Sequence, residues 1–335
     1  MATVMERSPR AVMPSIGLVL GAGGVVGSAW HAGVLAALDA DTSWDARAAD
    51  VVVGTSAGSV VAASLRAGLS PGDHLARATG TPLSPAGATL VARMGPVDEL
   101  PVRPQRPPSA WPANPRLALN ASWPPWPWRP LLGLAGVLPR GATSTDGIGD
   151  RLRELSGGER WPPMATWVVA VRLADGRRVV FGRDAVADPE PDLALAVQAS
   201  CAVPGVLAPV RIGGAEHIDG GVHSTTNADL LADLAFDAVI VSAPMAGRFR
   251  SLRPSPQALS RVAARTQVDR EVAAIRRRGT PVLVVQPGAA DIAEMDGRTM
   301  DPTRRDPVAR RAQRSTRALL AGPDAAEVVA ILRRA

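Results

Sequence analysis

A serine lies between two glycines in the segment Gly54-Thr55-Ser56-Ala57-Gly58. An apolar run, residues 51–53, precedes this segment and an alanine-rich stretch follows it, which predicts a strand, a sharp turn and a helix. In that context the G-x-S-x-G spacing is typical of a nucleophile elbow, a strained turn that presents a serine hydroxyl for attack on an acyl group. Gly54 and Gly58 suit the elbow because such a turn packs closely against neighbouring backbone. A serine that only caps a helix is the alternative interpretation.

A serine hydroxyl becomes a useful nucleophile only beside a base, which must be a histidine or a carboxylate. Of the four histidines, His31 and His74 lie in helical stretches and are interpreted as structural. The other two flank Asp219-Gly220-Gly221, where two glycines would let the aspartate carboxylate approach another loop closely. Asp219 as the direct base, His223 as the base of a Ser-His-Asp triad and an ordinary Asp-Gly turn remain open interpretations.

A glycine-rich turn, residues 21–24, follows the apolar run 15–20 and precedes a helical pattern that continues to about Ala40. Glycine amides at the start of a helix are not shielded by side chains. They can therefore stabilise a developing oxyanion. The same turn approximates the dinucleotide-binding pattern G-x-G-x-x-G, but the next glycine, Gly27, comes one residue late. No acidic residue clearly ends a second strand as that cofactor would require. A Rossmann-type nucleotide site is therefore kept only as an alternative.

The rest of the chain alternates short apolar runs with helical patterns. This alternation predicts an α/β fold with a mainly parallel sheet covered by helices on both faces. Ser255 and Pro256 supply the start of a long helix, and Gly279 its end. The expected strands are 15–20, 50–53, 167–171, 178–181, 238–241 and 281–285, and the later expected helices are 255–278, 306–320 and 324–334.

A stretch of unusual composition, residues 95–140, contains twelve prolines and Trp111, Trp123, Trp126 and Trp128. Proline at this density predicts neither a regular helix nor a central strand. A long irregular insertion is either a lid or a linker, and the tryptophans favour a lid or a patch that rests on a lipid interface. We therefore expect a Pro/Trp-rich, lid-like insertion with peripheral membrane contact as one of its roles.

The composition is that of a globular protein, with 46% hydrophobic and 20% charged residues among 335. No apolar run reaches the roughly 18 residues of a membrane-spanning helix, and the first residues lack a secretory signal, so we expect a cytoplasmic location. The net charge of +6 comes from arginines scattered among 31 acidic residues, which argues against nucleic-acid binding. The single cysteine, Cys201, excludes an internal disulfide and is interpreted as a small buried residue.

The glycine turn, the Gly54–Gly58 segment and Asp219-Gly220-Gly221 together resemble the patatin-like phospholipase family. The likeness extends to Gly27 and Gly33, to the block 199–205 and to Asn227, and so covers about residues 15–230. The resemblance implies a three-layer α/β/α sandwich and a Ser-Asp dyad that needs no histidine. It assigns the nucleophile to Ser56, the base to Asp219, the oxyanion hole to Gly21, Gly23 and Gly24, and supporting positions to Gly54, Gly58, Gly220 and Gly221.

By this resemblance the chain has a flexible N-terminus, 1–14, and one hydrolase domain, 15–335, with the insertion at 95–140. The substrate would be a lipid acyl ester, cleaved without a cofactor or metal, in the manner of a phospholipase A, a lysophospholipase or a nonspecific acyl hydrolase. Val26 stands where the family usually has Arg or Lys, so the resemblance predicts no fixed cation beside the turn. A catalytically silent scaffold is a further alternative, and the sequence leaves the oligomeric state open.

Overall fold

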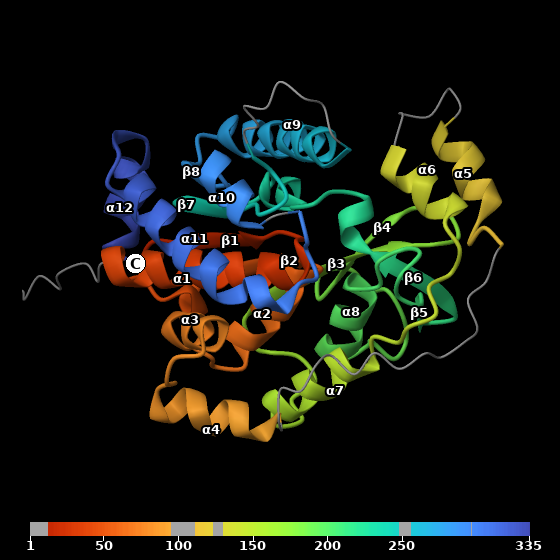
Figure 1. Ribbon diagram of the computed structural model, residues 1–335, viewed down its shortest axis with the longest axis horizontal. Coiled ribbons are helices and arrows are strands. Elements are labelled where there is room, and N and C mark those ends of the chain that lie inside the picture. The colour runs from red at the N-terminus through yellow and green to blue at the C-terminus, as the bar shows by residue number, and fades with distance from the viewer. Residues whose placement is uncertain (1–12, 95–110, 123–129, 248–255, 296) are drawn as a thin grey trace, which may run out of the picture.

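The computed structural model describes residues 13–94, 111–122, 130–247, 256–295 and 297–335. Their strands form one sheet in the order β5-β6-β3-β2-β1-β7-β8, and β4 also pairs with β3 (Figure 1). The strands are β1 (Ile16–Leu20), β2 (Val51–Thr55), β3 (Ala165–Arg172), β4 (Arg178–Phe181), β5 (Val210–Ile212), β6 (Ala215–Asp219), β7 (Ala238–Ser242) and β8 (Val282–Val285).

The sheet is parallel in its centre and antiparallel at one side. Strands β3, β2, β1, β7 and β8 run in the same direction. The strands β4, β5 and β6 are antiparallel to their partners. The prediction of a mainly parallel sheet is therefore confirmed. The turn between Arg172 and Arg178 is too short for the crossover that a parallel pair needs, which makes β3 and β4 a hairpin.

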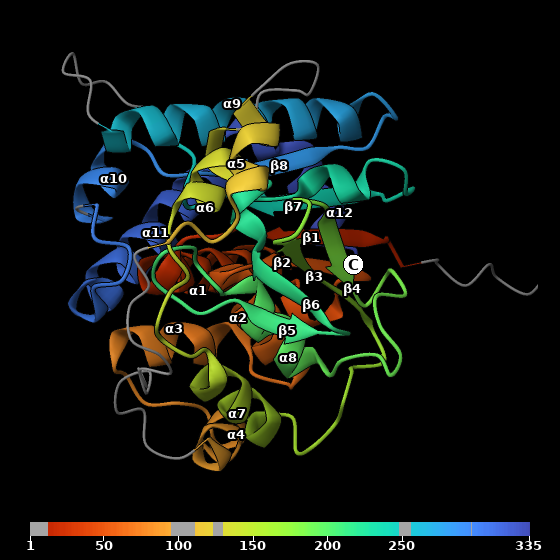
Figure 2. The same ribbon diagram turned by 90° about the vertical axis from the view of Figure 1, so that its right-hand side faces the viewer.

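Helices cover both faces of the sheet, which gives the three layers that the sequence predicted (Figures 1 and 2). On one face the apolar core joins β1 and β2 to α1, α2, α11 and α12, and β3 to α7 and α8. On the other face, β7 packs against α9, and β6 packs against α5 and α6. The helices are α1 (Gly24–Thr42), α2 (Ala57–Arg66), α3 (Pro71–Thr79), α4 (Pro85–Arg93), α5 (Pro115–Ser122), α6 (Pro130–Val137), α7 (Asp146–Leu155), α8 (Leu193–Ser200), α9 (Pro256–Arg276), α10 (Ala289–Met295), α11 (Arg305–Leu320) and α12 (Ala326–Leu332).

The run of β1 is apolar at every position because helices cover both faces of the sheet. Leu18 and Leu20 point into the core under α1, while Val19 points into the core under α9. All three side chains are fully buried. A strand that alternated polar with apolar residues would place polar groups in one of these two cores.

The prediction that the insertion holds no regular helix is wrong, because α5 and α6 both lie within it. Each begins at a proline, Pro115 or Pro130, and the first position of a helix tolerates proline since its amide has no intrahelical acceptor. Leu117 and Leu132 pack on Ile218 of β6, so this helix pair covers one end of the sheet. Its role as a lid stays a prediction.

Some sequence predictions lie outside the described residues. They concern the first twelve residues of the flexible N-terminus, the segment 95–110, the three tryptophans Trp123, Trp126 and Trp128, and the helix-capping Ser255. The helix that Ser255 was expected to cap is present as α9, and Gly279 follows it with a φ of 84°.

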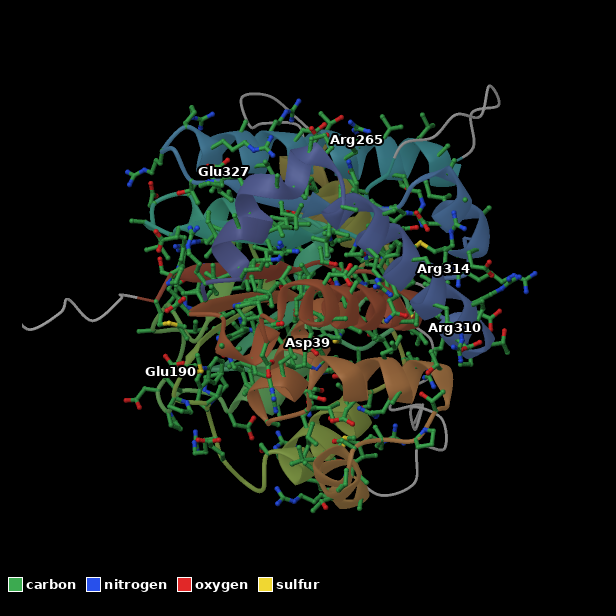
Figure 3. The ribbon with its side chains drawn as sticks, turned by 90° about the vertical axis from the view of Figure 1, so that its left-hand side faces the viewer. Asp39, Glu190, Arg265, Arg310, Arg314 and Glu327 are labelled. Atoms are coloured by element: carbon green, nitrogen blue, oxygen red, sulfur yellow. The ribbon has the colours of Figure 1, made fainter. Side chains whose placement is uncertain are left out.

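Charged side chains of both signs share the face drawn in Figure 3, where Asp39, Arg265, Arg310 and Glu327 come from four different helices. Some of these arginines pair with a carboxylate one turn away, as Arg310 does with Asp306 at 2.6 Å. Such exposed pairs contribute little to the free energy of unfolding. Within the part of the chain that the structure describes, no helix is long and apolar enough to cross a membrane.

Candidate active site

Two strands meet end to end along β3. The first half of β3 pairs with β2 in parallel, so that Thr55 lies opposite Val169. The second half pairs with β6, which runs the other way, so that Asp219 lies opposite Ala170. Because consecutive residues of a strand are about 3.3 Å apart, the carboxyl ends of β2 and β6 arrive at the same place. The sheet therefore places Ser56, the residue that follows Thr55, next to Asp219.

Ser56 occupies a strained turn between β2 and α2. Its φ of 52° and ψ of −121° lie in a region that residues with a side chain rarely adopt. The Ser56 amide donates to Ser200 Oγ at 2.8 Å, and the Ser59 hydroxyl donates to the Ser56 carbonyl at 2.6 Å. Ser200 in turn donates to the carbonyl of Val169 at 2.6 Å, which ties the turn to β3. These bonds stabilise the conformation that the elbow motif predicted.

Glycine is required on both sides of the serine. A Cβ at Gly54 would lie 2.5 Å from the Ser59 Cα, and a Cβ at Gly58 would overlap the carbonyl oxygen of Leu20. Backbone cannot move aside as a flexible side chain can. The expectation that Gly54 and Gly58 allow close packing of the turn is therefore met by the geometry.

Asp219 is buried and lies against Ser56. Its carboxylate accepts a hydrogen bond from the Gly221 amide at 2.7 Å, and the Ser56 side chain lies close enough to lower its pKa. Only 5% of the residue is exposed. Burial raises the pKa of Asp219 to about 6, because removing water destabilises its charged form, and the Ser56 side chain and the Gly221 amide lower it only in part. The raised pKa agrees with the expectation for a carboxylate among apolar neighbours.

The two glycines after Asp219 permit its approach to the strand ends. A Cβ at Gly220 would overlap the carbonyl oxygen of Val169, and one at Gly221 would lie 3.0 Å from Asp219 Oδ1 and 3.4 Å from the Cβ of Ala22. Gly221 therefore lies between the carboxylate and the glycine-rich turn. The aspartate, the serine and the turn belong to one continuous site.

The amides of the glycine-rich turn are not equivalent. The Gly21 amide donates to the carbonyl of Ser242 at 3.0 Å, and the Ala22 amide donates to the carbonyl of Thr225 at 2.7 Å. Gly21 is therefore a correction to the expected oxyanion hole, since its amide is already used by β7. The amides of Gly23 and Gly24 have no acceptor among the described residues. They lie at the start of α1, where the helix dipole favours negative charge.

His31 holds the glycine-rich turn in place. Its Nε2 lies 2.8 Å from the carbonyl oxygen of Gly21, and its Nδ1 lies 2.8 Å from Ser242 Oγ. A carbonyl can only accept, so Nε2 carries the proton and Nδ1 accepts from the serine. Burial lowers the pKa of His31 to about 4, which keeps the ring neutral. The interpretation of His31 as structural agrees with these contacts.

Glu271 of α9 organises the loop that follows Asp219, and the sequence analysis missed it. Its carboxylate accepts from Ser224 Oγ at 2.5 Å, from Thr226 Oγ1 at 2.6 Å and from the Ala228 amide at 2.8 Å. Asn227 of the same loop donates to Thr55 Oγ1 at 3.1 Å. The Glu271 carboxylate thus holds the loop whose Asn227 contacts β2, the strand that precedes Ser56. The sequence did contain one indication of this role. Glu271 lies within the buried apolar stripe of α9, which includes Val268, Val272 and Ile275, where a charged residue is unusual.

The other candidate residues are Cys201 and the histidines at positions 74, 217 and 223. Cys201 is buried, and burial raises the pKa of its thiol, as expected for a small core residue. His74 is buried in α3, where burial lowers its pKa to about 3, and its interpretation as structural agrees with this. His217 packs edge-on against the ring of Phe181. The His223 amide donates to the carbonyl of Gly220, and its role as a triad base stays a prediction.

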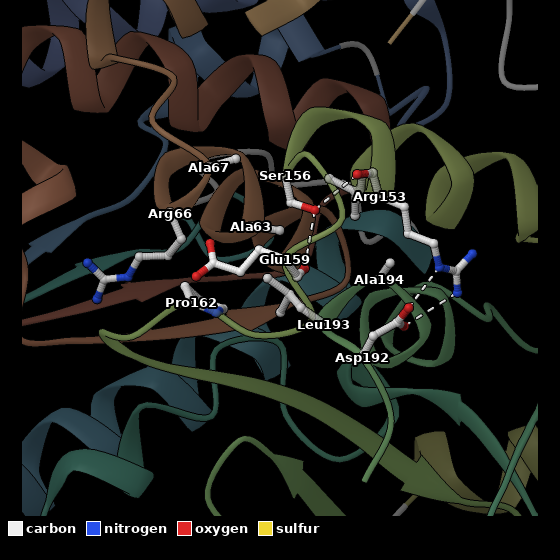
Figure 4. A pocket seen from close by; sticks show the side chains of 11 residues that line it. Ala63, Arg66, Ala67, Arg153, Ser156, Glu159, Pro162, Asp192, Leu193 and Ala194 are labelled. Atoms are coloured by element: carbon white, nitrogen blue, oxygen red, sulfur yellow. Dashed lines mark hydrogen bonds and ion pairs between the residues drawn. The ribbon is translucent and has the colours of Figure 1, made fainter. Parts of the chain in front are cut away.

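A crevice lies between α2, α7 and the start of α8 (Figure 4). Arg153 and Asp192 in its wall are paired at 2.8 Å. Arg66, at its other side, donates to the carbonyls of Ala49 and Ala165, at the amino-terminal ends of β2 and β3. Ser56 lies at the opposite edge of the sheet, so this crevice is separate from the candidate site. The described residues hold no group of three His, Cys, Asp or Glu side chains arranged for a metal ion.

The chain is similar to known proteins over much of its length. The family model for patatin-like phospholipase matches residues 18–232, and the chain belongs to that family of lipid acyl hydrolases. No curated protein matches the chain. The crystal structure of VipD from Legionella pneumophila is similar over 92% of this chain and 66% of that chain, with 14% identity and a TM-score of 0.42. The chain therefore spans just under two thirds of the VipD chain.

Replacing Asp219 with asparagine should stabilise the protein at about pH 8 by up to about 3 kcal/mol. The carboxyl pKa rises from 3.8 to about 6 on folding, so the folded protein holds that proton more tightly. The cost of the buried charge is absent below about pH 3.8, grows as the pH rises to about 6 and is complete above it. Asparagine retains an acceptor for the Gly221 amide and carries no charge.

Denaturant unfolding of both proteins at about pH 8 and about pH 3 measures this difference. We expect Asp219→Asn to be more stable than the original protein at about pH 8. At about pH 3 the difference between their free energies of unfolding should be smaller. An Asp192→Asn variant serves as control, because hydrogen bonds hold the pKa of that carboxyl below its usual range. A variant less stable than the original at both pH values would contradict the assignment of Asp219 as a buried, costly carboxylate.

Proposed function

We propose that this protein is a serine acyl hydrolase that cleaves lipid acyl esters with Ser56 as nucleophile and Asp219 as general base. The observation that carries the proposal is the position of the buried Asp219 carboxylate, close enough to the Ser56 side chain for that side chain to lower its pKa, beside two amides at the start of α1. Membership of the patatin-like phospholipase family supports the substrate class. A carboxylate with a pKa of about 6 is ionised at neutral pH and is a stronger base than an exposed aspartate.

In the first step the Ser56 Oγ attacks the ester carbonyl carbon while its proton moves to the Asp219 carboxylate. The carbonyl oxygen becomes negative, and the amides of Gly23 and Gly24 donate hydrogen bonds to it. The tetrahedral intermediate collapses, the bond to the leaving alcohol breaks, and Asp219 returns the proton to that alcohol. The product of this half-reaction is an acyl group bound to Ser56.

In the second step water attacks the acyl carbon and Asp219 takes the water proton. The same two amides stabilise the second oxyanion, and the fatty acid leaves as Ser56 regains its proton from Asp219. One carboxylate thus serves both halves, which a base with a pKa near neutral can do. His223 as the base and a nucleotide-binding function remain the alternatives from sequence, and no observation favours either.

The apolar surface near Asp219 suits a lipid substrate. Exposed apolar side chains are found on α6 and on the loop 203–207, and Leu138 after α6 lies against Gly205 of that loop. The loop begins beside the site, because the Asp219 amide donates to the carbonyl of Ala202. We define the lipid-contact surface by its members Leu131, Leu134, Val137, Val203 and Val206. Contact with an aggregated lipid through this surface would bring acyl chains next to Ser56.

A fluorophosphonate probe should label Ser56, and Ser56→Ala should lose both labelling and the hydrolysis of p-nitrophenyl butyrate. Loss of a nucleophile costs several orders of magnitude in rate, of the order of 10⁴ or more. Asp219→Asn should reduce hydrolysis to a similar extent because the base is lost.

Ser64→Ala is the matched control, since it removes another buried serine hydroxyl of α2, one that donates to the carbonyl of Val60 and not to the turn. Full hydrolysis by Ser56→Ala would reject the proposal. A His223→Ala protein that loses activity as completely as Ser56→Ala would reject the dyad in favour of a triad.

Replacing Val137 and Val206 with aspartate should weaken binding to phospholipid vesicles by about tenfold for each side chain that inserts. That factor corresponds to the free energy of burying one valine side chain. Val262→Asp is the control, because Val262 of α9 is 49% exposed, similar to Val137 at 56% and Val206 at 58%. Vesicle co-sedimentation measures the effect, and equal binding by all variants would reject the lipid-contact surface.

A further inference from the structure

A turn near the end of the chain, residues 298–301, lies against the start of α1. Its Thr299 carbonyl accepts a hydrogen bond from the Val26 amide at 3.0 Å. A Cβ at Gly24 would lie 2.6 Å from that carbonyl oxygen and 2.9 Å from Met300 Sδ. Since ordinary covalent geometry places such a Cβ about 2.5 Å from the Gly24 nitrogen, Met300 Sδ lies within about 5.5 Å of that nitrogen. Met300 is therefore a neighbour of the amides that we assign to the oxyanion hole.

Backbone hydrogen bonds fix the position of Met300. The Asp301 amide closes the turn by donating to the carbonyl of Arg298 at 3.1 Å. Asp301 Oδ1 then accepts from the Thr303 amide at 2.9 Å and caps the short helix that follows. The turn is thus held at its end as well as at α1, while Met300 itself is 52% exposed. An exposed apolar side chain in a fixed place beside the site is available to a substrate.

A second apolar side chain lies at the preceding glycine. A Cβ at Gly23 would lie 2.9 Å from Cγ of Pro244, the second residue after β7. Pro244 is buried, so it supports the glycine-rich turn and leaves Met300 as the more accessible of the two. Both residues come from the part of the chain after residue 232, where the family match ends. This wall of the site therefore lies outside the matched region.

The two ends of the glycine-rich turn have different neighbours. A Cβ at Gly221, the residue whose amide binds the Asp219 carboxylate, would lie 3.4 Å from the Cβ of Ala22, whereas Gly24 lies against Met300. In the proposed reaction Asp219 returns a proton to the leaving alcohol, so that alcohol lies on the Asp219 side of the carbonyl carbon. The acyl chain leaves the same carbon on the other side and extends toward Gly24 and Met300.

We propose that Met300 is a specificity-determining residue, which binds the acyl chain of the substrate beside the oxyanion hole. The inference rests on the proposed function, because the direction of the chain follows from the role of Asp219. An unbranched thioether side chain adapts its shape to a flexible apolar group. Each methylene group that leaves water on contact with Met300 adds to the affinity, so the residue favours longer acyl chains over short ones.

Calorimetric titration of the intact protein with octanoate and butanoate tests this contact without any measurement of catalysis. Both ligands bring a carboxylate to the same amides and differ only in chain length. We expect octanoate to bind more tightly, and the ratio of the two Kd values to shrink by about fivefold in Met300→Ala. That factor corresponds to about half of the free energy of burying a methionine side chain, since Met300 is already half-buried.

Met300→Leu should keep most of the preference for octanoate, because leucine is apolar and similar in volume. Met164→Ala is the matched control and should leave the ratio unchanged. Met164 is also a partly exposed methionine, at 39%, but it precedes β3 at the amino-terminal edge of the sheet, away from Ser56.

Hydrolysis of p-nitrophenyl octanoate and p-nitrophenyl butyrate should show the same dependence. The ratio of their kcat/KM values is expected to fall about fivefold in Met300→Ala and to stay unchanged in Met164→Ala. Ethyl butyrate and octyl butyrate test the opposite orientation of the substrate. If Met300→Ala changes the ratio for these two alcohols and not the ratio for the two acyl chains, Met300 contacts the leaving group and the inference is wrong.

Two calorimetric results would overturn the inference. One is a ratio of Kd values that is the same in Met300→Ala as in the original protein. The other is an equal loss in Met300→Leu and Met300→Ala, which would indicate a disturbed turn rather than a lost apolar contact. Failure of the proposed function has a different signature, since no ester would then be hydrolysed by any of the proteins. The Kd ratio would still decide whether Met300 contacts an acyl chain.

Discussion

The site depends on one strand, β3, which pairs with two others along the same edge. β2 takes the first half of that edge and β6 the second, and because they run in opposite directions, their carboxyl ends face each other. This arrangement places Asp219 beside Ser56 although 163 residues separate them in the chain. A fully parallel sheet could not do this, since all its strand ends would lie side by side.

Hydrogen bonds from outside the site keep three backbone segments in position. Glu271 holds the loop after Asp219, and that loop contacts both the serine strand, through Asn227, and the glycine-rich turn, through the carbonyl of Thr225. His31 fixes the turn from the other side. Hydrogen bonds between buried groups thus hold the strained turn at Ser56 in place. Each of these groups acts through others, so we regard them as positioning residues.

Local patterns predicted β1, β2, β3, β4, β7 and β8, the elbow and the glycines beside it, because each of these features depends on a few adjacent residues. The pairing of β6 with β3 could not be predicted in the same way, since register between distant strands depends on the whole fold. Glu271 was missed for a related reason. It lies within a helical pattern where a charged residue normally faces water, and only packing against the sheet makes it buried.

The most direct test of the account is the titration of the Asp219 carboxyl by carbon NMR, in the original protein and in Ser56→Ala. Burial and the nearby Ser56 side chain predict a pKa of about 6, and a higher value once the serine hydroxyl is removed. An ordinary pKa of about 4 that does not change in Ser56→Ala would contradict the meeting of the two side chains.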